Sequence, residues 1–166
     1  MTDRVRILAI DPGDVHVGLA DFIEDPSNEV MGWSCTDASE ITHEDAMQRL
    51  AHPDKLNAYD AVIVERFSLY PDVAMSLTGK EMLTAELVGA IRLACMIAVV
   101  PVFKQPASWQ QPVQGVLRHL RLGSTAKRQK AGPHAFSAEL HGWAYLMRAG
   151  VTTTKVPTVF ELHPDL

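Results

Sequence analysis

Long apolar runs, internal repeats and low-complexity segments are all missing from this sequence of 166 residues. A membrane-spanning helix needs about 20 consecutive apolar residues, and Met1 to Arg6 lacks the pattern of a signal peptide. With 47% hydrophobic residues, the chain is long enough to bury a sizeable core. We therefore expect one soluble domain over residues 1–150, followed by a Thr- and Pro-rich C-terminal tail over residues 151–166.

Cysteine is scarce. Cys35 and Cys95 are the two cysteines of the chain, and both lie in apolar surroundings without metal-like spacing. We predict that both are buried free thiols in a reducing compartment such as the cytoplasm, with a single disulfide between them as the alternative.

Acidic residues are missing from a long part of the chain. Residues 87–138 contain no Asp or Glu but seven Lys and Arg, whereas residues 1–86 contain 17 acidic and 6 basic residues. This asymmetry predicts a surface that binds phosphates, with an affinity that falls as salt rises. A merely solvated basic face is the alternative. The candidate phosphate-binding residues are Arg118, Arg121, Lys127, Arg128 and Lys130.

What is present is organised around the stretch that contains Asp11. The apolar run Val5 to Ile10 is typical of a buried strand, and Pro12-Gly13 after Asp11 forces a tight turn. A second apolar stretch, Val15 to Ala20, predicts a return strand and so a hairpin. Asp11 then sits on a rigid strand end, as a catalytic metal ligand requires, although an Asp that merely opens a turn has the same pattern.

A second buried strand also ends in an acid. The segment Tyr59 to Glu65 has a β-branched core and finishes at Glu65. In α/β sheets, ligands bind beyond the carboxyl ends of the strands. Two such strand ends would bring Asp11 and Glu65 within reach of one metal ion.

Further elements follow from local patterns. Capping residues and apolar spacing predict three helices, over His43 to Leu50 with Thr42 or Ser39 as the cap, Ser76 to Ile97, and from Pro106 onward with a kink at Pro112. Gly89 inside the second helix is expected to allow close approach to the sheet. Apolar runs predict strands over Glu29 to Cys35 and Ala98 to Phe103, and a possible short strand in the tail over Val156 to Leu162. Leu122 to Gly132 is expected to be a flexible basic loop.

The last predicted helix runs from His134 to about Ala149, after Pro133 at its first position. His134, Ser137 and His141 share one face of it, because residues three and four apart are neighbours on a helix. Two histidines on one face suggest a ligand set, while a core or capping role for each is the alternative.

The order of these motifs resembles the RNase H-like fold, and more narrowly the RuvC-type Holliday junction resolvases of bacteriophages and bacteria. The segments that carry the resemblance are Ile10-Asp11-Pro12-Gly13 with Gly18, Val64-Glu65-Arg66-Phe67, Glu86 to Arg92, Pro106 to Gly115 and His134 to His141. The match covers nearly the whole domain. It implies an α/β protein with a mixed five-stranded sheet flanked by helices.

In that family, four side chains, three or four of them carboxylates, bind two divalent metal ions, Mg²⁺ or Mn²⁺. The resemblance places Asp11, Glu65 and His134 at three of these positions, with Asp11 bridging both ions. Ser137 stands where the family has an acid, and its hydroxyl is a weak Mg²⁺ ligand. Either this residue weakens or abolishes cleavage, or His141 or Glu139 takes over. Glu139 lies off the shared helix face, so His141 is the better reserve.

The family also carries lysines on its basic helix. Gln110 stands at one such place, and Arg121 keeps a positive charge near the other, where it would stabilise charge rather than act as a base. Phe67, or Tyr70 a little further along, is expected to stack on an unpaired base of the DNA, with core packing as the alternative for Phe67.

The resemblance implies a metal-dependent endonuclease that cleaves Holliday junctions and other branched DNA by two-metal-ion hydrolysis. It also implies a homodimer, because a four-way junction is two-fold symmetric, and a cytoplasmic location, in the host if the gene is a phage gene. Three alternatives are a cleavage-deficient protein that binds branched DNA, a less specific nuclease of flaps, forks or RNA, and an actin-like or sugar-kinase ATPase. The last needs two such domains, for which 166 residues leave no room.

Overall fold

The computed structural model describes residues 4–67 and 82–150. Its centre is a mixed five-stranded sheet with the strand order β3-β2-β1-β4-β5. β1 pairs antiparallel with β2 and parallel with β4, and β4 pairs parallel with β5. The strands are β1 (Arg6–Asp11), β2 (His16–Glu24), β3 (Trp33–Thr42), β4 (Ala61–Glu65) and β5 (Val102–Gln105).

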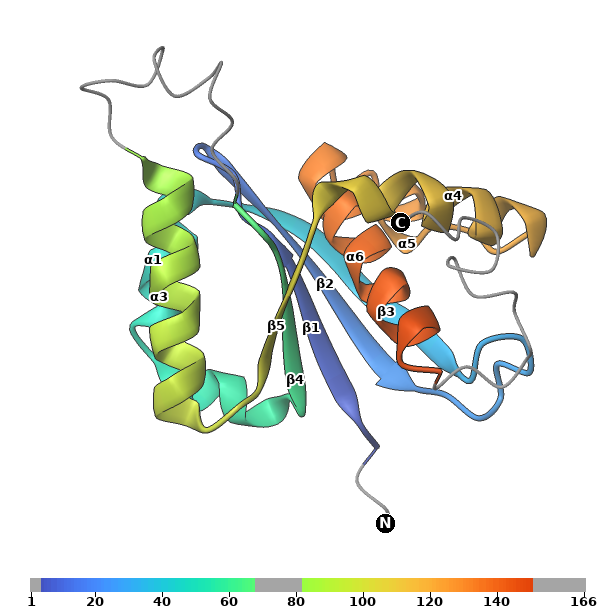
Figure 1. The fold of residues 1–166 in the computed structure, drawn as a ribbon, viewed down its shortest axis with the longest axis horizontal. Coiled ribbons are helices and arrows are strands. Elements are labelled where there is room, and N and C mark those ends of the chain that lie inside the picture. Colours follow the sequence, from blue (N-terminus) through green and yellow to red (C-terminus); the bar gives the residue numbers. More distant parts are fainter. Residues whose placement is uncertain (1–3, 68–81, 151–166) are drawn as a thin grey trace.

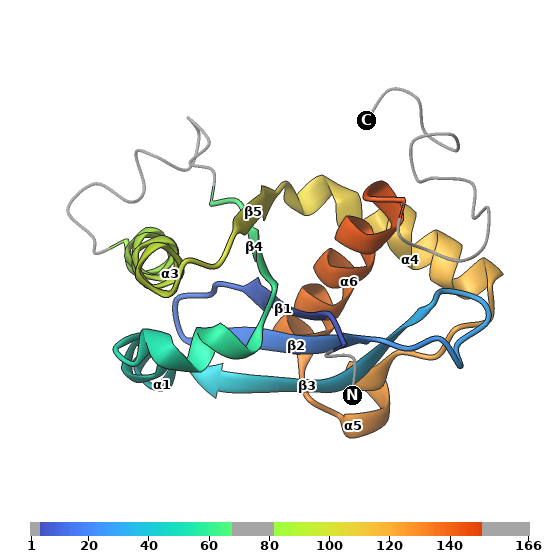
Figure 2. The same ribbon diagram turned by 90° about the horizontal axis from the view of Figure 1, so that it is seen from below.

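Helices cover both faces of the sheet (Figures 1 and 2). One face carries α4 (Gln110–His119), α5 (Thr125–Gln129) and α6 (Pro133–Arg148), and the short turn η3 (Ala107–Trp109) leads into α4. The other face carries α1 (His43–Leu50), η1 (Pro53–Ala58) and α3 (Leu83–Ala98). Each face buries its own hydrophobic cluster, so the sheet separates two cores. This arrangement confirms the expected fold class.

The alternation of side chains along two strands positions the acids. In β1, Ile7 and Ala9 enter the core under α6, while Leu8 and Ile10 enter the core under α3. Asp11 is in phase with Ile7 and Ala9, because successive side chains point to opposite faces. In β4 the same rule puts Glu65 in phase with Ile63, which also belongs to the α6 side. Both carboxylates therefore face the last helix.

β3 and β5 begin four residues later than predicted, whereas the other three strands begin within two residues of the prediction. The segment before β3 forms a turn, in which Gly32 N donates to Asn28 O and the Asn28 side chain donates to Trp33 O. These local bonds hold residues 29–32 out of the sheet, so β3 begins at Trp33. β5 begins at Val102, because α3 continues to Ala98 and Val99 ends it in the left-handed conformation.

Two predictions about glycine and proline are wrong. Gly89 is exposed on α3, and an added Cβ would meet nothing within 4 Å, so it does not serve close approach to the sheet. Pro112 lies in the first turn of α4, where a missing N–H costs no helical hydrogen bond, so it makes no interior kink.

The basic segment after Leu122 is partly helical, contrary to the predicted flexible loop. Ser124 caps the N-terminus of α5 by accepting from Lys127 N, and Thr125 and Ala126 are buried. The fully buried Glu139 of α6 accepts from Thr125 N at 2.9 Å, Ala126 N at 3.0 Å and Ser124 Oγ at 2.6 Å. A carboxylate at a helix N-terminus is also favoured by the helix dipole. Glu139 therefore anchors α5. Both of its carboxylate oxygens accept hydrogen bonds at the start of that helix, so they do not face the predicted metal site.

Several other predictions are confirmed. α1 spans His43–Leu50 with Thr42 as its cap, and α6 begins at Pro133. Cys35 and Cys95 are free and buried, in different cores. No helix in the described ranges is long and apolar enough to cross a membrane. Tyr70, the first residues of the predicted long helix and the tail strand lie outside the described residues, so the domain boundary at residue 150 stays a prediction.

Candidate active site

Asp11 and Glu65 end two neighbouring parallel strands. The β1–β4 register pairs Ile10 with Val64, so the residue after each lies at the same edge of the sheet. The side chain of Asp11 is 11% exposed and that of Glu65 is 23% exposed. Two partly buried carboxylates at one sheet edge form the centre of the candidate site, as the sequence predicts.

His134 pairs with Asp11. Its Nδ1 donates to Asp11 Oδ2 at 2.9 Å, and its ring remains partly exposed. Two contacts fix the start of α6 here. Glu40 of β3 accepts from His134 N, and a Cβ on Gly18 would lie 2.0 Å from the His134 carbonyl oxygen. Gly18 therefore lets the N-terminus of α6 approach β2 closely enough to place His134 beside Asp11.

His141 pairs with Glu65 in the same way. Its Nε2 donates to Glu65 Oε2 at 2.8 Å, and the ring is fully buried. Gln105 lies beside it at the end of β5. With its amide nitrogen turned toward α6, Gln105 donates to His141 O at 3.1 Å and accepts from Tyr145 N at 3.2 Å. This contact ties the edge strand to the helix that carries the histidines.

Gln110 and Ser137 join the two pairs. The Gln110 side-chain nitrogen donates to Glu65 Oε2 at 3.0 Å and to Ser137 Oγ at 2.7 Å, and it lies 3.1 Å from His141 Nε2. Ser137 also lies near Asp11, and its hydroxyl favours the ionised form of that carboxyl group. Six side chains from β1, β4, α4 and α6 thus form one polar network at the carboxyl ends of the parallel strands. They are Asp11, Glu65, Gln110, His134, Ser137 and His141.

The proximity of two acids perturbs Asp11. Burial raises the pKa of its carboxyl group above the usual range, and the negative charge of Glu65 raises this pKa further. Hydrogen bonds from His134 and Ser137 offset part of that increase by stabilising the ionised form. The network thus holds negative charge that a cation bound between the two carboxylates would relieve.

The donor chemistry of the network fits a divalent metal ion. Charged carboxylate oxygens are the ligands that Mg²⁺ and Mn²⁺ prefer, and an imidazole nitrogen is a common further ligand for Mn²⁺. Within residues 4–67 and 82–150, however, no three His, Cys, Asp or Glu side chains converge on one metal position. Each histidine is bonded to a carboxylate, so a shared ion would replace these bonds.

Solved structures share this architecture, whereas no protein-family model and no curated protein sequence matches the chain. Thermus thermophilus RuvC has a TM-score of 0.60 at 18% identity, with 89% of this chain and 98% of that chain covered. The same protein in complex with Holliday junction substrate has a TM-score of 0.58 at 17% identity, with the same coverage. The fowlpox virus resolvase, in complex with its substrate Holliday junction DNA, has a TM-score of 0.59 at 10% identity, covering 87% of this chain and 99% of that chain.

This chain has the RNase H-like fold of the RuvC-type resolvases. The expected mixed five-stranded sheet flanked by helices is thereby confirmed. In this RNase H-like fold, the predicted site residues Asp11, Glu65, His134, Ser137 and His141 come together. Gln110, expected on the basic helix, belongs to the same network.

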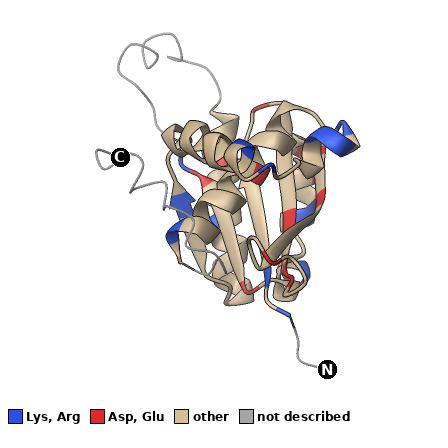
Figure 3. Ribbon diagram, turned by 90° about the vertical axis from the view of Figure 1, so that its right-hand side faces the viewer, with Lys and Arg blue, Asp and Glu red and all other residues tan. Residues whose placement is uncertain are grey.

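The predicted DNA-binding residues of this RNase H-like chain are not part of that network. The five basic residues of α4, α5 and the segments after them are all exposed. Arg121 follows α4 at the end away from Gln110, about 15 Å along the helix by its length, so it is not a charge next to the carboxylates. Lys127 lies 4.4 Å from the Phe136 ring centroid. In Figure 3, Lys and Arg are spread over several segments rather than gathered in one stripe.

Phe67 is partly buried against the core cluster under α3, which is the alternative packing role expected for it. Its stacking on DNA stays a prediction. The residues that sequence reasoning missed are Glu40, Gln105 and the positioning role of Gly18. A polar residue at the end of the apolar β5 run was the available signal for Gln105, since it repeats the pattern of the other two parallel strands.

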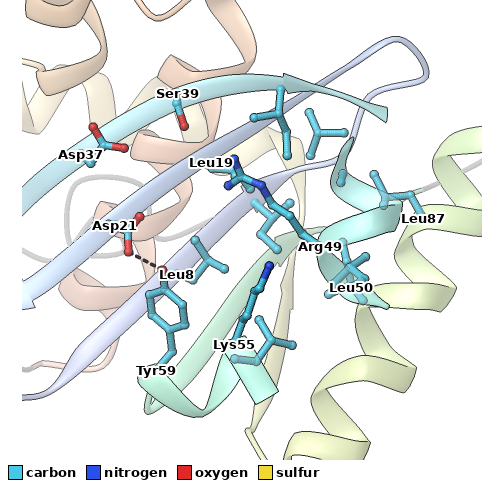
Figure 4. Close-up of a pocket in the computed structure, with 16 residues that line it drawn as sticks. Leu8, Leu19, Asp21, Asp37, Ser39, Arg49, Leu50, Lys55, Tyr59 and Leu87 are labelled. Atoms are coloured by element: carbon cyan, nitrogen blue, oxygen red, sulfur yellow. Dashed lines mark hydrogen bonds between the residues drawn. The ribbon is translucent and has the colours of Figure 1, made fainter. Parts of the chain in front are cut away.

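A cavity of about 410 Å³ lies on the opposite face of the sheet, between β1–β3 and the helices α1 and α3 (Figure 4). Its floor is aliphatic, and Arg49, Lys55 and Tyr59 stand at its rim. None of the predicted site residues lines it. The cavity is therefore separate from the carboxylate network.

Proposed function

We propose that this protein is a structure-specific endonuclease that cleaves Holliday junctions and other branched DNA with two divalent metal ions, Mg²⁺ or Mn²⁺. The observation that carries the proposal is the partly buried pair Asp11 and Glu65 at adjacent ends of parallel strands, with a histidine beside each. The fold is that of resolvases solved with Holliday junction DNA, which supports branched DNA as the substrate class.

Asp11, Glu65 and His134 would hold the metal, with Asp11 shared between two ions. When bound, the metal supplies activation of the attacking water and stabilisation of the leaving 3′ oxygen. Gln110 and Ser137 orient the carboxylates through the bonds described above. His141 is the reserve ligand, since its Nε2 would reach an ion only by leaving Glu65.

The exposed basic residues between Arg118 and Lys130 would bind backbone phosphates without reading sequence. Glu139 supports this role, because it fixes the start of α5 and with it the direction of Lys127 and Arg128. A sequence-independent grip suits a substrate that is recognised by its branched shape.

We also infer a homodimer, and the outer face of α3 is the surface that fits it. Four apolar side chains are exposed there, with Met82 at 39%, Leu93 at 54%, Met96 at 70% and Ile97 at 60%. Gly89 lies at the centre of this face, and its surroundings are open. Such a contiguous apolar patch marks an interaction site.

The α3 face is self-complementary about Gly89. Glu86 and Arg92, both exposed, lie three residues before and three residues after it. If two antiparallel copies of α3 cross at Gly89 on a two-fold axis, Glu86 of each copy lies at the level of Arg92 of the other, and each such contact occurs twice. Met82 and Met96 face each other by the same rule, seven residues on either side.

The decisive experiment is cleavage of a labelled four-way junction, compared with linear duplex of the same sequence, with Mg²⁺ or Mn²⁺ present. We expect paired nicks confined to branched DNA. The Asp11→Asn variant should keep junction binding and lose at least about a hundredfold in nicking rate, because the missing charge removes a metal ligand. If Asp11→Asn lost both junction binding and nicking, Asp11 would not be a residue that acts in the cleavage step alone.

The cleavage-deficient binder is the second candidate, and Ser137 is the observation that favours it. Ser137 is a neutral hydroxyl next to Asp11. A Ser137→Asp variant tests it: a junction bound but not nicked by the parent and nicked by the variant would assign the second function. Flap, fork and RNA substrates in the same assay separate a less specific nuclease from a resolvase.

A further inference from the structure

A second hollow lies beside the carboxylate network, at the β5 edge of the sheet. β5 is the last strand in the sheet order, and the hollow, of about 230 Å³, is bounded by β5, η3 and the C-terminal half of α6. Neither the basic segment nor the metal site accounts for it. The residues that line it include Phe103, Lys104, Gln105, Trp109, Tyr145 and Arg148.

Aromatic rings dominate this hollow: Phe103 is exposed, and Trp109 and Tyr145 are partly buried. Phe103 is 41% exposed, and its ring centroid lies 5.0 Å from that of Tyr145 with a tilt of 41°. The Arg148 guanidinium lies 4.5 Å from the centroid of the Trp109 ring. By contrast, Trp33 and Trp143 are 6% and 5% exposed within the core. Aromatic side chains left partly in water at a sheet edge are typical of a binding surface.

The charge of the hollow is of one sign. Lys104 and Arg148 are both exposed, and none of the residues that line the hollow is acidic. Accessible aromatic faces next to cations are the combination that binds single-stranded nucleic acid, where bases stack and phosphates meet positive charge.

The hollow adjoins the candidate site through two residues. Gln105 lines the hollow and pairs with Glu65 in the β4–β5 register. Trp109 directly precedes Gln110, whose amide contacts Glu65. A strand that crosses the carboxylates along this edge therefore meets the aromatic rings next.

We propose that Phe103, Trp109 and Tyr145, with Lys104 and Arg148, form a platform that binds an unpaired nucleotide of the substrate beside the cleavage site. This inference rests on the proposed function and deepens it, since it specifies a branch point with unpaired bases as the preferred substrate. The base stacks on the aromatic rings, while the two cations neutralise the flanking phosphates.

The test is binding of a short oligothymidylate and of a blunt duplex to the full chain in EDTA, with no metal and no cleavage. Trp33 and Trp143 are buried, so the quenching of tryptophan fluorescence by the oligonucleotide reports on Trp109. We expect quenching by the single strand and little by the duplex. Phe103→Leu and Arg148→Gln should each weaken single-strand binding by roughly tenfold, because the first removes a stacking ring and the second removes a positive charge near the phosphates.

Arg49→Gln is the matched control, because it removes one arginine from the opposite face of the sheet. It should change the affinity less than twofold. If all three variants bind the single strand as the parent does, or lose affinity equally, the platform is wrong. Nicking of junctions with an unchanged Phe103→Leu affinity would overturn the platform and keep the proposed function. Weaker single-strand binding by Phe103→Leu, together with no nicking of junctions by the parent, would keep the platform and overturn the proposed nuclease activity.

Discussion

At the scale of a single residue, the surroundings of Asp11 disfavour the charge of its own carboxylate. The fold buries its carboxyl group next to Glu65, and both effects raise its pKa. The folded protein therefore binds this proton more tightly than the unfolded chain does. Ionised Asp11 costs stability at pH values above its folded pKa, and this cost disappears as the pH falls through that pKa. A bound divalent cation would explain an acid at this position, because it would stabilise the ionised carboxylate.

Removing that charge should stabilise the protein when no metal is present. We expect Asp11→Asn to have a higher denaturation midpoint than the parent at neutral pH in EDTA, with a difference that shrinks as the pH is lowered. Added Mn²⁺ should stabilise the parent by up to about 2.7 kcal/mol at a hundredfold excess over its Kd, and the variant much less. Urea unfolding at several pH values measures both. A variant that is less stable than the parent at neutral pH would show that the His134 bond outweighs the repulsion.

At the scale of elements, the basic helix α5 depends on a residue of another helix. α5 has five residues and could not be stable by itself, because isolated helices of this length do not form in water. Glu139 supplies acceptors for two buried N–H groups at its start. The direction of Lys127 and Arg128 is therefore a consequence of one buried carboxylate.

Glu139→Ala should release α5. Two buried N–H groups lose their acceptor, so we expect a loss of about 3 kcal/mol in the free energy of unfolding, together with weaker junction binding. Thermal unfolding and a binding titration check the two effects. Glu44→Ala on the exposed surface of α1 is the control and should change both by little. Unchanged stability in Glu139→Ala would mean that water replaces the carboxylate.

At the scale of the whole molecule, the two faces of the sheet differ in chemistry. The α6 side holds the polar network and the hollow proposed as a platform. On the α3 side, the apolar outer face of the helix is exposed within the described part of the chain. A dimer through α3 would place one carboxylate network on each outer side of the assembly, as two symmetric cuts in a four-way junction need.

The dimer can be tested by its charges. Leu93→Glu should give a monomer in sedimentation velocity, because each interface would bury two new unpaired charges. Glu86→Arg and Arg92→Glu should each weaken the dimer by about fivefold or more, and the double exchange should restore it, since opposite charges again face each other. A double variant as weak as either single one would exclude the crossing at Gly89. A parent that is monomeric at all concentrations would exclude the dimer itself.

Local patterns were enough for the scaffold of the site. The apolar runs before Asp11 and Glu65 specify two strands that end in acids, Thr42 specifies the start of α1, and Pro133 specifies the start of α6. These features depend on periodicity, capping and backbone restriction, which act over a few residues. The shared face of His134, Ser137 and His141 follows from helical spacing alone.

Contacts between distant segments could not be derived in this way. The Gln110 side chain donates to Glu65, 45 positions away, and Ala38 N donates to the Gln129 side-chain oxygen, 91 positions away. The helix α5, whose residues lack a strong local pattern, exists because Glu139 lies next to it in space. Gly89 turns outward because packing, and not spacing, selects which side of α3 meets the sheet. Local sequence thus determined the strands, the helices other than α5 and the identity of the acids. The tertiary fold decided which polar groups meet, because hydrogen bonds between remote residues form only where packing brings them together.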